Sequence, residues 1–149
     1  QYGHTVQQWI IQNSGLDNIN FITKTKIGLQ SIWSHDSYKH IRQKLQEFQP
    51  DVVHVHNTVP LISPSVYTAC RDAGVPVVHT LHNYKLICPG GYLYRNGSVC
   101  EDCIGKLAPY PAVEHGCYRG SCLQTALAAA GLLTNRLGST YKSDVDIYI

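Results

Sequence analysis

The chain has 149 residues, of which 15% are charged, and its formal net charge is +2. This length is enough for one domain with a buried core. The low charge excludes a disordered polyelectrolyte and offers no basic stripe, so we expect no nucleic-acid partner. No apolar run reaches the roughly 18 residues needed to cross a bilayer.

The first 30 residues carry the weakest pattern. Short apolar runs at 9–11 and 21–23 are each expected to form a strand, with a turn between them marked by polar residues and glycine at 13–18. His4 and Trp9 are expected to pack or to face water rather than to form a site.

From Ser34 onward the sequence predicts a helix. Ser34, Asp36 and Ser37 can each cap its first turn, and Pro50 ends it because proline cannot donate a hydrogen bond. Apolar residues recur at helical spacing at Tyr38, Ile41, Leu45 and Phe48. The basic residues between them form a solvated face, with peripheral attraction to an anionic membrane surface as the alternative.

Two valine-rich runs, at 51–56 and 76–81, are typical of strands that are buried on both faces of a parallel sheet. Between them, Ser63 as N-cap and Pro64 as the first helical residue begin a helix that Gly74 ends. Strand, helix and strand in this space predict a right-handed βαβ unit.

A βαβ unit brings the carboxyl ends of its two strands to one edge of the sheet, where open α/β sheets bind their ligands. We therefore expect six polar residues to lie close together at this edge: His54, His56, Asn57, Thr80, His82 and Asn83. His54 and His79 lie further back along their strands and are more simply explained as packing residues.

Residues 84–120 show no clear periodicity and contain four of the six cysteines, Cys88, Cys100, Cys103 and Cys117. An insert of this length is unusual in a compact domain unless it is functional or fastened down. Cys100 and Cys103 have the spacing that lets two thiolates share one zinc ion, and the other two cysteines could complete a structural site. Free thiols and disulfides are the alternatives. Residues 95–98 predict a tight hairpin.

Ser121 is expected to cap a helix over 123–137 that Gly138 ends, and its alanine-rich surface predicts burial on most sides. Residues 144–149 have the pattern of another strand. Because the chain begins at Gln1 and stops within this strand, we expect the domain to be incomplete at both ends.

Several segments together resemble the family 4 retaining glycosyltransferases, which have the two-domain GT-B fold. They are PDVVHVHN at 50–57, LISPS at 61–65, AGVPVV at 73–78 and TLHNYKLICP at 80–89. The resemblance covers residues 31–149, and the segments around Cys100 and Cys117 are similar to a cysteine-bearing subgroup. Cys122 departs from that subgroup and is left out of the metal site. The glycine-rich loop after the family's first strand is not found, and neither is the donor-binding domain.

The resemblance implies an α/β fold with a Rossmann-like, doubly wound and mostly parallel sheet. Residues 1–149 would form a single N-terminal, acceptor-side domain, with 84–120 as a cysteine-rich insert. It also implies transfer of a sugar from a nucleotide-sugar donor to a glycan or lipid-linked acceptor, without metal in the catalytic site. The enzyme would be cytoplasmic and bacterial, act in polysaccharide biosynthesis and work at the inner face of the membrane.

The resemblance also suggests roles for the residues at the strand ends. His82 corresponds to the histidine that projects toward the donor sugar and its phosphates, and is the candidate catalytic residue. The candidate substrate-binding residues are His56, Asn57, Thr80 and Asn83.

Two other functions fit parts of the sequence. A metal-dependent hydrolase could use His54, His56 and His82 as a three-histidine zinc site, although no carboxylate stands near the strand ends. A non-catalytic binding module could be built on a zinc-stabilised cysteine insert, but the polar edge of the sheet would then have no role.

Overall fold

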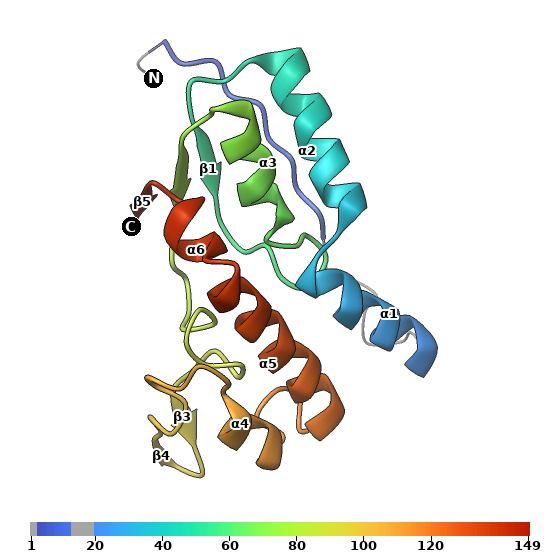
Figure 1. The fold of residues 1–149 in the computed structure, drawn as a ribbon, viewed down its shortest axis with the longest axis vertical. Helices are drawn as coiled ribbons and strands as arrows, with labels where there is room; N and C mark the ends of the chain where they lie inside the picture. The colour runs from blue at the N-terminus through green and yellow to red at the C-terminus, as the bar shows by residue number, and fades with distance from the viewer. Residues whose placement is uncertain (1–2, 13–19) are drawn as a thin grey trace.

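The computed structural model describes residues 3–12 and 20–149, so the turn predicted at 13–18 lies outside the described residues. The elements in chain order are α1 (Phe21–Ile32), α2 (His35–Phe48), β1 (Val53–Val55), α3 (Ser65–Ala73), β2 (Val77–His79), β3 (Tyr94–Arg95), β4 (Ser98–Val99), α4 (Tyr110–Glu114), α5 (Cys122–Leu137), α6 (Thr140–Ser143) and β5 (Ile147–Tyr148). Figure 1 shows two halves: α2 and α3 lie beside the sheet, while α1, α4, α5 and the small hairpin lie below.

The sheet is parallel and has the strand order β1–β2–β5. The predicted pairing of the two valine-rich strands and the strand near the C-terminus are both confirmed. The register places Val53 opposite Val77 and Val55 opposite His79. Each strand is shorter than the apolar run that predicted it. The predicted α/β class with a Rossmann-like parallel sheet is confirmed.

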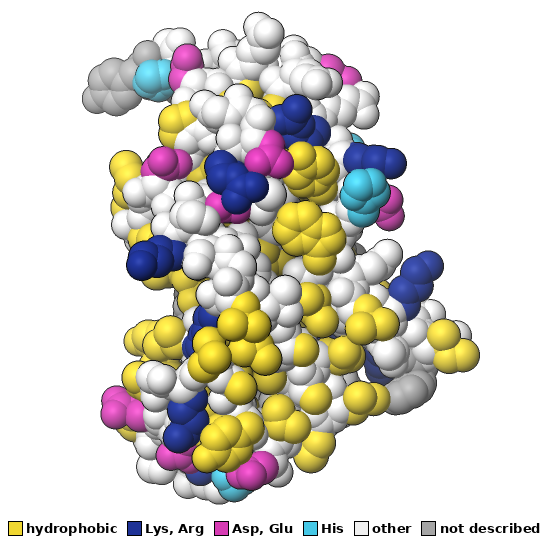
Figure 2. All heavy atoms as spheres, viewed as in Figure 1, with side chains coloured by type: hydrophobic (Ala, Val, Ile, Leu, Met, Phe, Trp, Pro, Cys, Tyr) yellow, Lys and Arg dark blue, Asp and Glu magenta, His cyan; other side chains and the backbone are white. Residues whose placement is uncertain are grey.

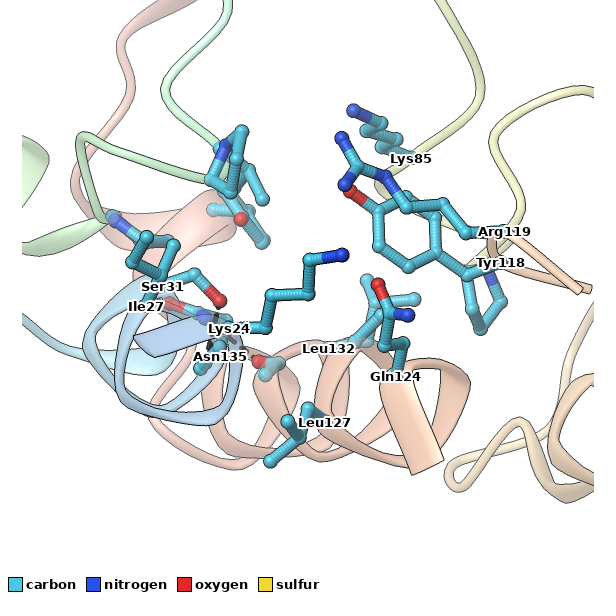
Figure 3. Close-up of a pocket in the computed structure, with 18 residues that line it drawn as sticks. Lys24, Ile27, Ser31, Lys85, Tyr118, Arg119, Gln124, Leu127, Leu132 and Asn135 are labelled. Atoms are coloured by element: carbon cyan, nitrogen blue, oxygen red, sulfur yellow. Dashed lines mark hydrogen bonds between the residues drawn. The ribbon is translucent and has the colours of Figure 1, made fainter. Parts of the chain in front are cut away.

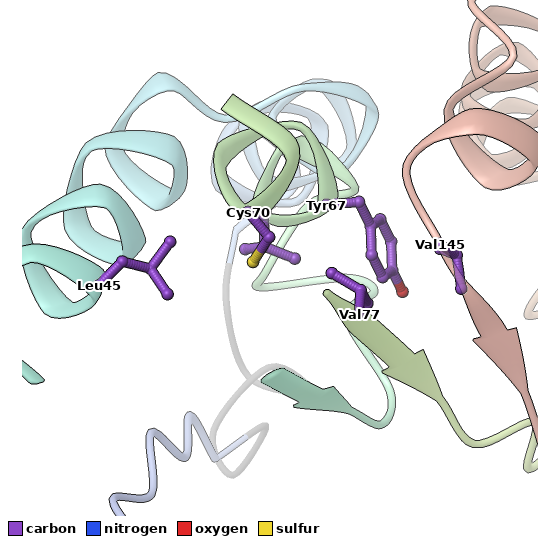
Figure 4. Packing of buried hydrophobic residues seen from close by; sticks show 6 residues of the cluster. Leu45, Tyr67, Cys70, Val77 and Val145 are labelled. Carbon is purple, nitrogen blue, oxygen red and sulfur yellow. The ribbon is translucent and has the colours of Figure 1, made fainter. Parts of the chain in front are cut away.

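The core lies between α2, α3 and the sheet. Figure 4 shows Leu45, Tyr67, Cys70, Val77 and Val145 packed together there. Tyr67 and Cys70 have no exposed surface, and burial raises the pKa of the Cys70 thiol to about 12. Cys70 is therefore an inert core residue, as its place on the apolar side of the helix predicted.

Helix α2 begins and ends as predicted. The Ser34 hydroxyl accepts a hydrogen bond from the Ser37 N–H at 3.1 Å, and Gln49 adopts the left-handed conformation just before Pro50. Helix α3 starts one residue later than expected, at Ser65, with Pro64 preceding it. Gly74 ends it with a φ of 70°, in agreement with the prediction.

Ser63 caps the start of α3, as predicted, by accepting a hydrogen bond from the Ser65 N–H at 3.3 Å, and it also joins two elements. Its hydroxyl accepts a hydrogen bond from the Ser34 N–H at 2.8 Å and lies 2.7 Å from the Ser65 hydroxyl. The Ser65 hydroxyl in turn donates to the Ser34 carbonyl at 2.8 Å. All three serines are buried, so these hydrogen bonds fasten the start of α2 to the start of α3 away from water.

The strand predicted at 21–23 is wrong, because these residues begin helix α1. Asn20 caps the helix by accepting a hydrogen bond from the Thr23 N–H at 2.8 Å. The helix packs against α5, where a side chain at Gly28 would come within 2.5 Å of Leu127. This packing outweighs the strand preference of a short apolar run. Residues 9–11 form no strand either, and Trp9 packs partly against the core.

The second half of the molecule contains the insert. Its predicted hairpin is confirmed as β3–β4, with Asn96 and Gly97 at φ 51° and 84° in the turn. Ser121 caps α5 as predicted. Gly138 follows the last turn but is not left-handed, and Ser139 has the positive φ instead.

Helix α5 is less buried than expected. Its buried residues are Thr125, Ala129, Leu132 and Asn135, while Leu123 and Leu137 are exposed. Figure 2 shows apolar side chains gathered over this half of the molecule, across α5 and α4. Among the described residues, no helix is both long and apolar enough to span a membrane.

The buried serine contacts lead to a stability prediction. Ser63→Ala leaves the Ser34 N–H without its acceptor and removes a partner of Ser65. We expect the free energy of unfolding to fall by about 1–3 kcal/mol, the cost of an unsatisfied buried polar group. Urea denaturation measures this change. Ser98→Ala, on the exposed strand β4, is the control and should leave stability almost unchanged. Equal midpoints for the two variants would contradict the role of Ser63.

Candidate functional site

The polar residues at the carboxyl ends of β1 and β2 lie side by side, as the sequence predicted. Beyond the register pairs, the Thr80 N–H donates to the Val55 carbonyl at 3.0 Å. The segments that follow β1 and β2 therefore begin side by side. His56 therefore comes opposite the segment that carries His82. The loops after β1 and β2 leave this edge together.

Three histidines, His54, His56 and His82, form what we call the histidine cluster. His56 Nδ1 and His82 Nε2 are 2.8 Å apart, and the two ring centroids are 5.1 Å apart. The His54 and His56 ring centroids are 4.4 Å apart, and His54 Nε2 lies 2.7 Å from the Thr80 hydroxyl. All three side chains are exposed, so a ligand can reach them.

The contact between His56 and His82 restricts their protonation. One ring must donate and the other must accept, so the accepting ring is neutral. The pKa of His56 is lowered by partial loss of hydration and further by the neighbouring His54 and His82. Both effects keep the pair from carrying two positive charges near neutral pH. This contact uses Nε2 of His82 and leaves its Nδ1 free to meet a ligand.

The predicted asparagines join the same edge. The Asn83 amide donates to the Asn57 side-chain oxygen at 3.3 Å, and the Asn83 oxygen accepts from the Lys85 N–H at 3.0 Å. Thr80, Asn57 and Asn83 thus all contact another residue of the edge. The structure brings together every strand-end residue that the sequence singled out.

The two histidines expected to be packing residues differ. His79 is buried, lies 3.2 Å from the Tyr67 hydroxyl and has a pKa lowered by burial, in agreement with that expectation. His54 is exposed and belongs to the cluster, so the packing expectation is wrong for it. The reason is the side-chain alternation of a strand, which places His54 and His56 on the same side.

The four cysteines of the insert are unpaired thiols, and Cys103 is buried while the other three are half-buried. Burial raises the pKa of Cys103, and the three neighbouring thiols raise it further. Burial also raises the pKa of Cys117, while Arg95 opposes the shift. The four side chains are therefore close enough to influence one another.

Their arrangement is nevertheless not that of a finished metal site. Within residues 3–12 and 20–149, no group of three or more His, Cys, Asp or Glu side chains is placed to hold an ion. The donor set of four thiols suits zinc chemically, but binding would need a different arrangement of the side chains. The same finding applies to the histidine cluster, in which one ring nitrogen of each histidine already takes part in a hydrogen-bond contact.

A cavity of about 100 Å³ next to this edge was not predicted. It lies between α1, α5 and the loops after β1 and β2, and Figure 3 shows Lys24, Lys85 and Arg119 around it. Lys85 stands two residues after Asn83, which could have marked it in the sequence. No sequence signal marks Lys24, because residues 21–23 predict a strand where helix α1 begins, and no local pattern marks Arg119.

The comparisons with known proteins bear on the same segment. A family model described as Glycosyltransferase Family 4 matches residues 21–101, more than half of the chain. The match contains β1, β2 and the whole histidine cluster, and it ends inside the insert before Cys103. No curated protein and no solved structure gave a match.

The coupling within the histidine cluster can be tested by titration. We expect His56 to titrate below the ordinary value of 6.5, and His82→Ala to move its pKa upward because one neighbouring charge is removed. NMR of the imidazole nitrogens measures both values. His35→Ala, on the exposed start of α2, should leave the His56 titration unchanged. A His56 midpoint at or above 6.5 in the unaltered protein would contradict the coupling.

Proposed function

We propose a specific role on the premise that the chain belongs to glycosyltransferase family 4. The chain forms the acceptor-side half of a two-domain GT-B enzyme. This enzyme moves a sugar from a nucleotide-sugar donor to a glycan or lipid-linked acceptor, with retention at the anomeric carbon. The observation that carries the proposal is the histidine cluster, which lies within the matched segment at the ligand-binding edge of a parallel sheet.

The reaction breaks the bond between the anomeric carbon and the diphosphate oxygen, forms a bond to the oxygen of an acceptor hydroxyl, and passes the proton of that hydroxyl to the leaving diphosphate. Positive charge develops on the sugar and negative charge on the leaving diphosphate. Preorganised hydrogen-bond donors at that position are the main means of stabilising this change. His82 fits this role because its Nε2 contacts His56, and in the tautomer in which Nε2 accepts, Nδ1–H is a hydrogen-bond donor.

The neighbouring residues complete the proposed site. His56, Asn57, Thr80 and Asn83 bind substrate, chiefly the acceptor, and their mutual hydrogen bonds hold them in place. The catalytic site uses no metal, because a second domain supplies most phosphate contacts to the donor.

We place the enzyme in the bacterial cytoplasm, in polysaccharide biosynthesis, and at the inner face of the membrane. Helix α2 supports a peripheral contact only weakly. Lys39 is exposed, but Lys44 lies 3.9 Å from Glu47, which offsets its charge. Neither the hydrolase nor the separate binding module is favoured by a specific observation.

We also propose that Cys88, Cys100, Cys103 and Cys117 bind one structural zinc ion. Three observations support this proposal: the four thiols are unpaired, they influence one another's pKa, and the hairpin β3–β4 leads directly into Cys100. Zinc would neutralise the thiolates and fasten an insert with little regular structure to the sheet edge.

His82→Ala tests the proposed catalytic role. We expect kcat for sugar transfer to fall by roughly 10²–10³-fold, the usual cost of losing one preorganised donor. The assay should use the chain together with whatever its gene encodes after Ile149, and should follow release of the nucleotide diphosphate. His35→Ala serves as the matched control. Full activity of His82→Ala would reject the role assigned to this residue.

Metal analysis tests the zinc proposal. We expect one zinc per chain in the purified protein, loss of the ion in Cys100→Ser, and retention in Cys122→Ser, whose thiol is exposed and outside the set. Retention in the double variant His54→Ala/His56→Ala would separate this site from a hydrolase centre. Zinc-free protein whose thiols react equally with and without chelator would contradict the proposal.

A further inference from the structure

We propose that the cavity between α1, α5 and the loops after β1 and β2 binds an anionic amphiphile, namely a phosphate or diphosphate ester that carries an apolar chain. This inference rests on the proposed function, because it specifies the acceptor as lipid-linked rather than as a free glycan. It is carried by the lining of the cavity.

One side of the cavity is apolar. Helix α5 contributes Leu127, Ala128, Gly131 and Leu132, and helix α1 contributes Ile27. The volume of about 100 Å³ exceeds by several-fold the roughly 10–15 Å³ that one water molecule needs. There is thus room for a phosphate group and the first carbons of a chain. The polar Asn135 side chain on this side already donates to the Gly131 carbonyl at 2.7 Å.

The opposite side of the cavity is positively charged. Figure 3 shows Lys24 extending from α1 across the cavity toward Tyr118 and Arg119, with Lys85 close by. Among the described residues that line the cavity, none is Asp or Glu. The ion pairs between described residues involve none of these three cations. Positive charge therefore gathers here without an opposite charge from the described chain.

Two of the cations are held in place at a cost in free energy. Lys85 is half-buried. Its pKa is lowered mainly by burial and further by the positive charge of the nearby Arg119. A side chain at Gly91, which has a φ of 84°, would come within 3.1 Å of Lys85 Cγ, so glycine is needed beside this lysine. Arg119 has a φ of 55°, a strained value for a residue with a side chain, and its guanidinium lies 5.6 Å from the Tyr118 ring centroid.

An anion would compensate the like charges, and a phosphate suits them best. Its several oxygens can meet an arginine in a two-pronged contact and two lysines at once, whereas a carboxylate has only two oxygens. The apolar side would remain wet with a simple anion but would be covered by a hydrocarbon chain. Helix α5 also exposes Leu123 and Leu137 on its outer side, which suits a ligand that arrives from a membrane.

The cavity is joined to the asparagines next to the histidine cluster through their side chains. The Lys85 N–H donates to Asn83, and Asn83 donates to Asn57. An anionic group bound at Lys85 would consequently lie on the same wall as His82. That placement suits an acceptor whose sugar hydroxyl is close to its phosphate.

Direct binding tests the assignment without requiring catalysis. Isothermal calorimetry on the 149-residue chain would compare farnesyl diphosphate, kept below its micelle-forming concentration, with inorganic pyrophosphate and farnesol. We expect farnesyl diphosphate to bind at least tenfold more tightly than either, with an affinity that falls as salt is added. Equal binding of pyrophosphate would reduce the site to an anion site, and equal binding of farnesol would make it merely apolar. Either result, or no binding at all, overturns the proposal.

Two variants separate the charged and apolar sides. Lys85→Gln/Arg119→Gln should weaken farnesyl diphosphate binding about tenfold or more, while Lys26→Gln/Lys39→Gln, which removes two exposed charges outside the cavity, should not. Gly131→Ala places a methyl group in the cavity and meets only Ile32, at 3.7 Å, so it should fold normally. It should weaken farnesyl diphosphate but not pyrophosphate. Equal affinities in all three variants would refute the assignment.

The two proposals fail separately. A protein that transfers sugar but shows no preference for farnesyl diphosphate refutes the cavity assignment alone. A protein that binds farnesyl diphosphate selectively but transfers no sugar refutes the proposed function alone. Circular dichroism and thermal melting of each variant would show that a loss of binding does not come from unfolding.

Discussion

The register between β1 and β2 is the constraint on which the candidate site depends. Side chains alternate along a strand, so a shift of one residue would turn every side chain of β1 to the other face. The observed pairing of Val55 with His79 leaves His56 and His82 just beyond the strands, with His56 Nδ1 and His82 Nε2 2.8 Å apart. The strands themselves have only three residues each, so their ladder alone cannot fix this register. The core must do so.

Packing on α3 supplies that support. Tyr67 and Cys70 are completely buried against Val77 of β2, and Val145 closes the other side next to β5. Polar contacts hold the segment between α6 and β5 to α3. The buried Asp144 accepts hydrogen bonds from the Thr68 hydroxyl at 2.8 Å and from the Arg71 guanidinium at 2.9 Å. Removing one partner of a buried carboxylate is costly, so these contacts hold β5 and α3 together. The exposed, adaptable residues at the sheet edge are thus carried by a rigid and buried frame.

The sequence predicted this frame and its edge well because the signals there are local and agree with one another. Valine-rich runs, a cap at Ser34 and a glycine at position 74 each act over a few residues. Helix α1 was missed because its strand-like first residues are overruled by packing on α5, which is a contact between distant segments. The cavity was missed for the same reason: Lys24, Lys85 and Arg119 come from three segments that only the folded chain brings together. The buried role of Ser63 likewise depends on Ser34, far away in the sequence.

The histidine cluster and the cavity divide the electrostatic work along one wall. In the cluster, partial loss of hydration and the neighbouring His54 and His82 oppose protonation of His56. The cavity instead gathers two lysines and an arginine, and none of the described residues that line it is acidic. A substrate with a permanent anionic group and a neutral hydroxyl fits this division, with the anion at Lys85 and the hydroxyl at the cluster. Asn83 follows His82 directly and accepts a hydrogen bond from the Lys85 N–H, so it connects the cluster to the cavity.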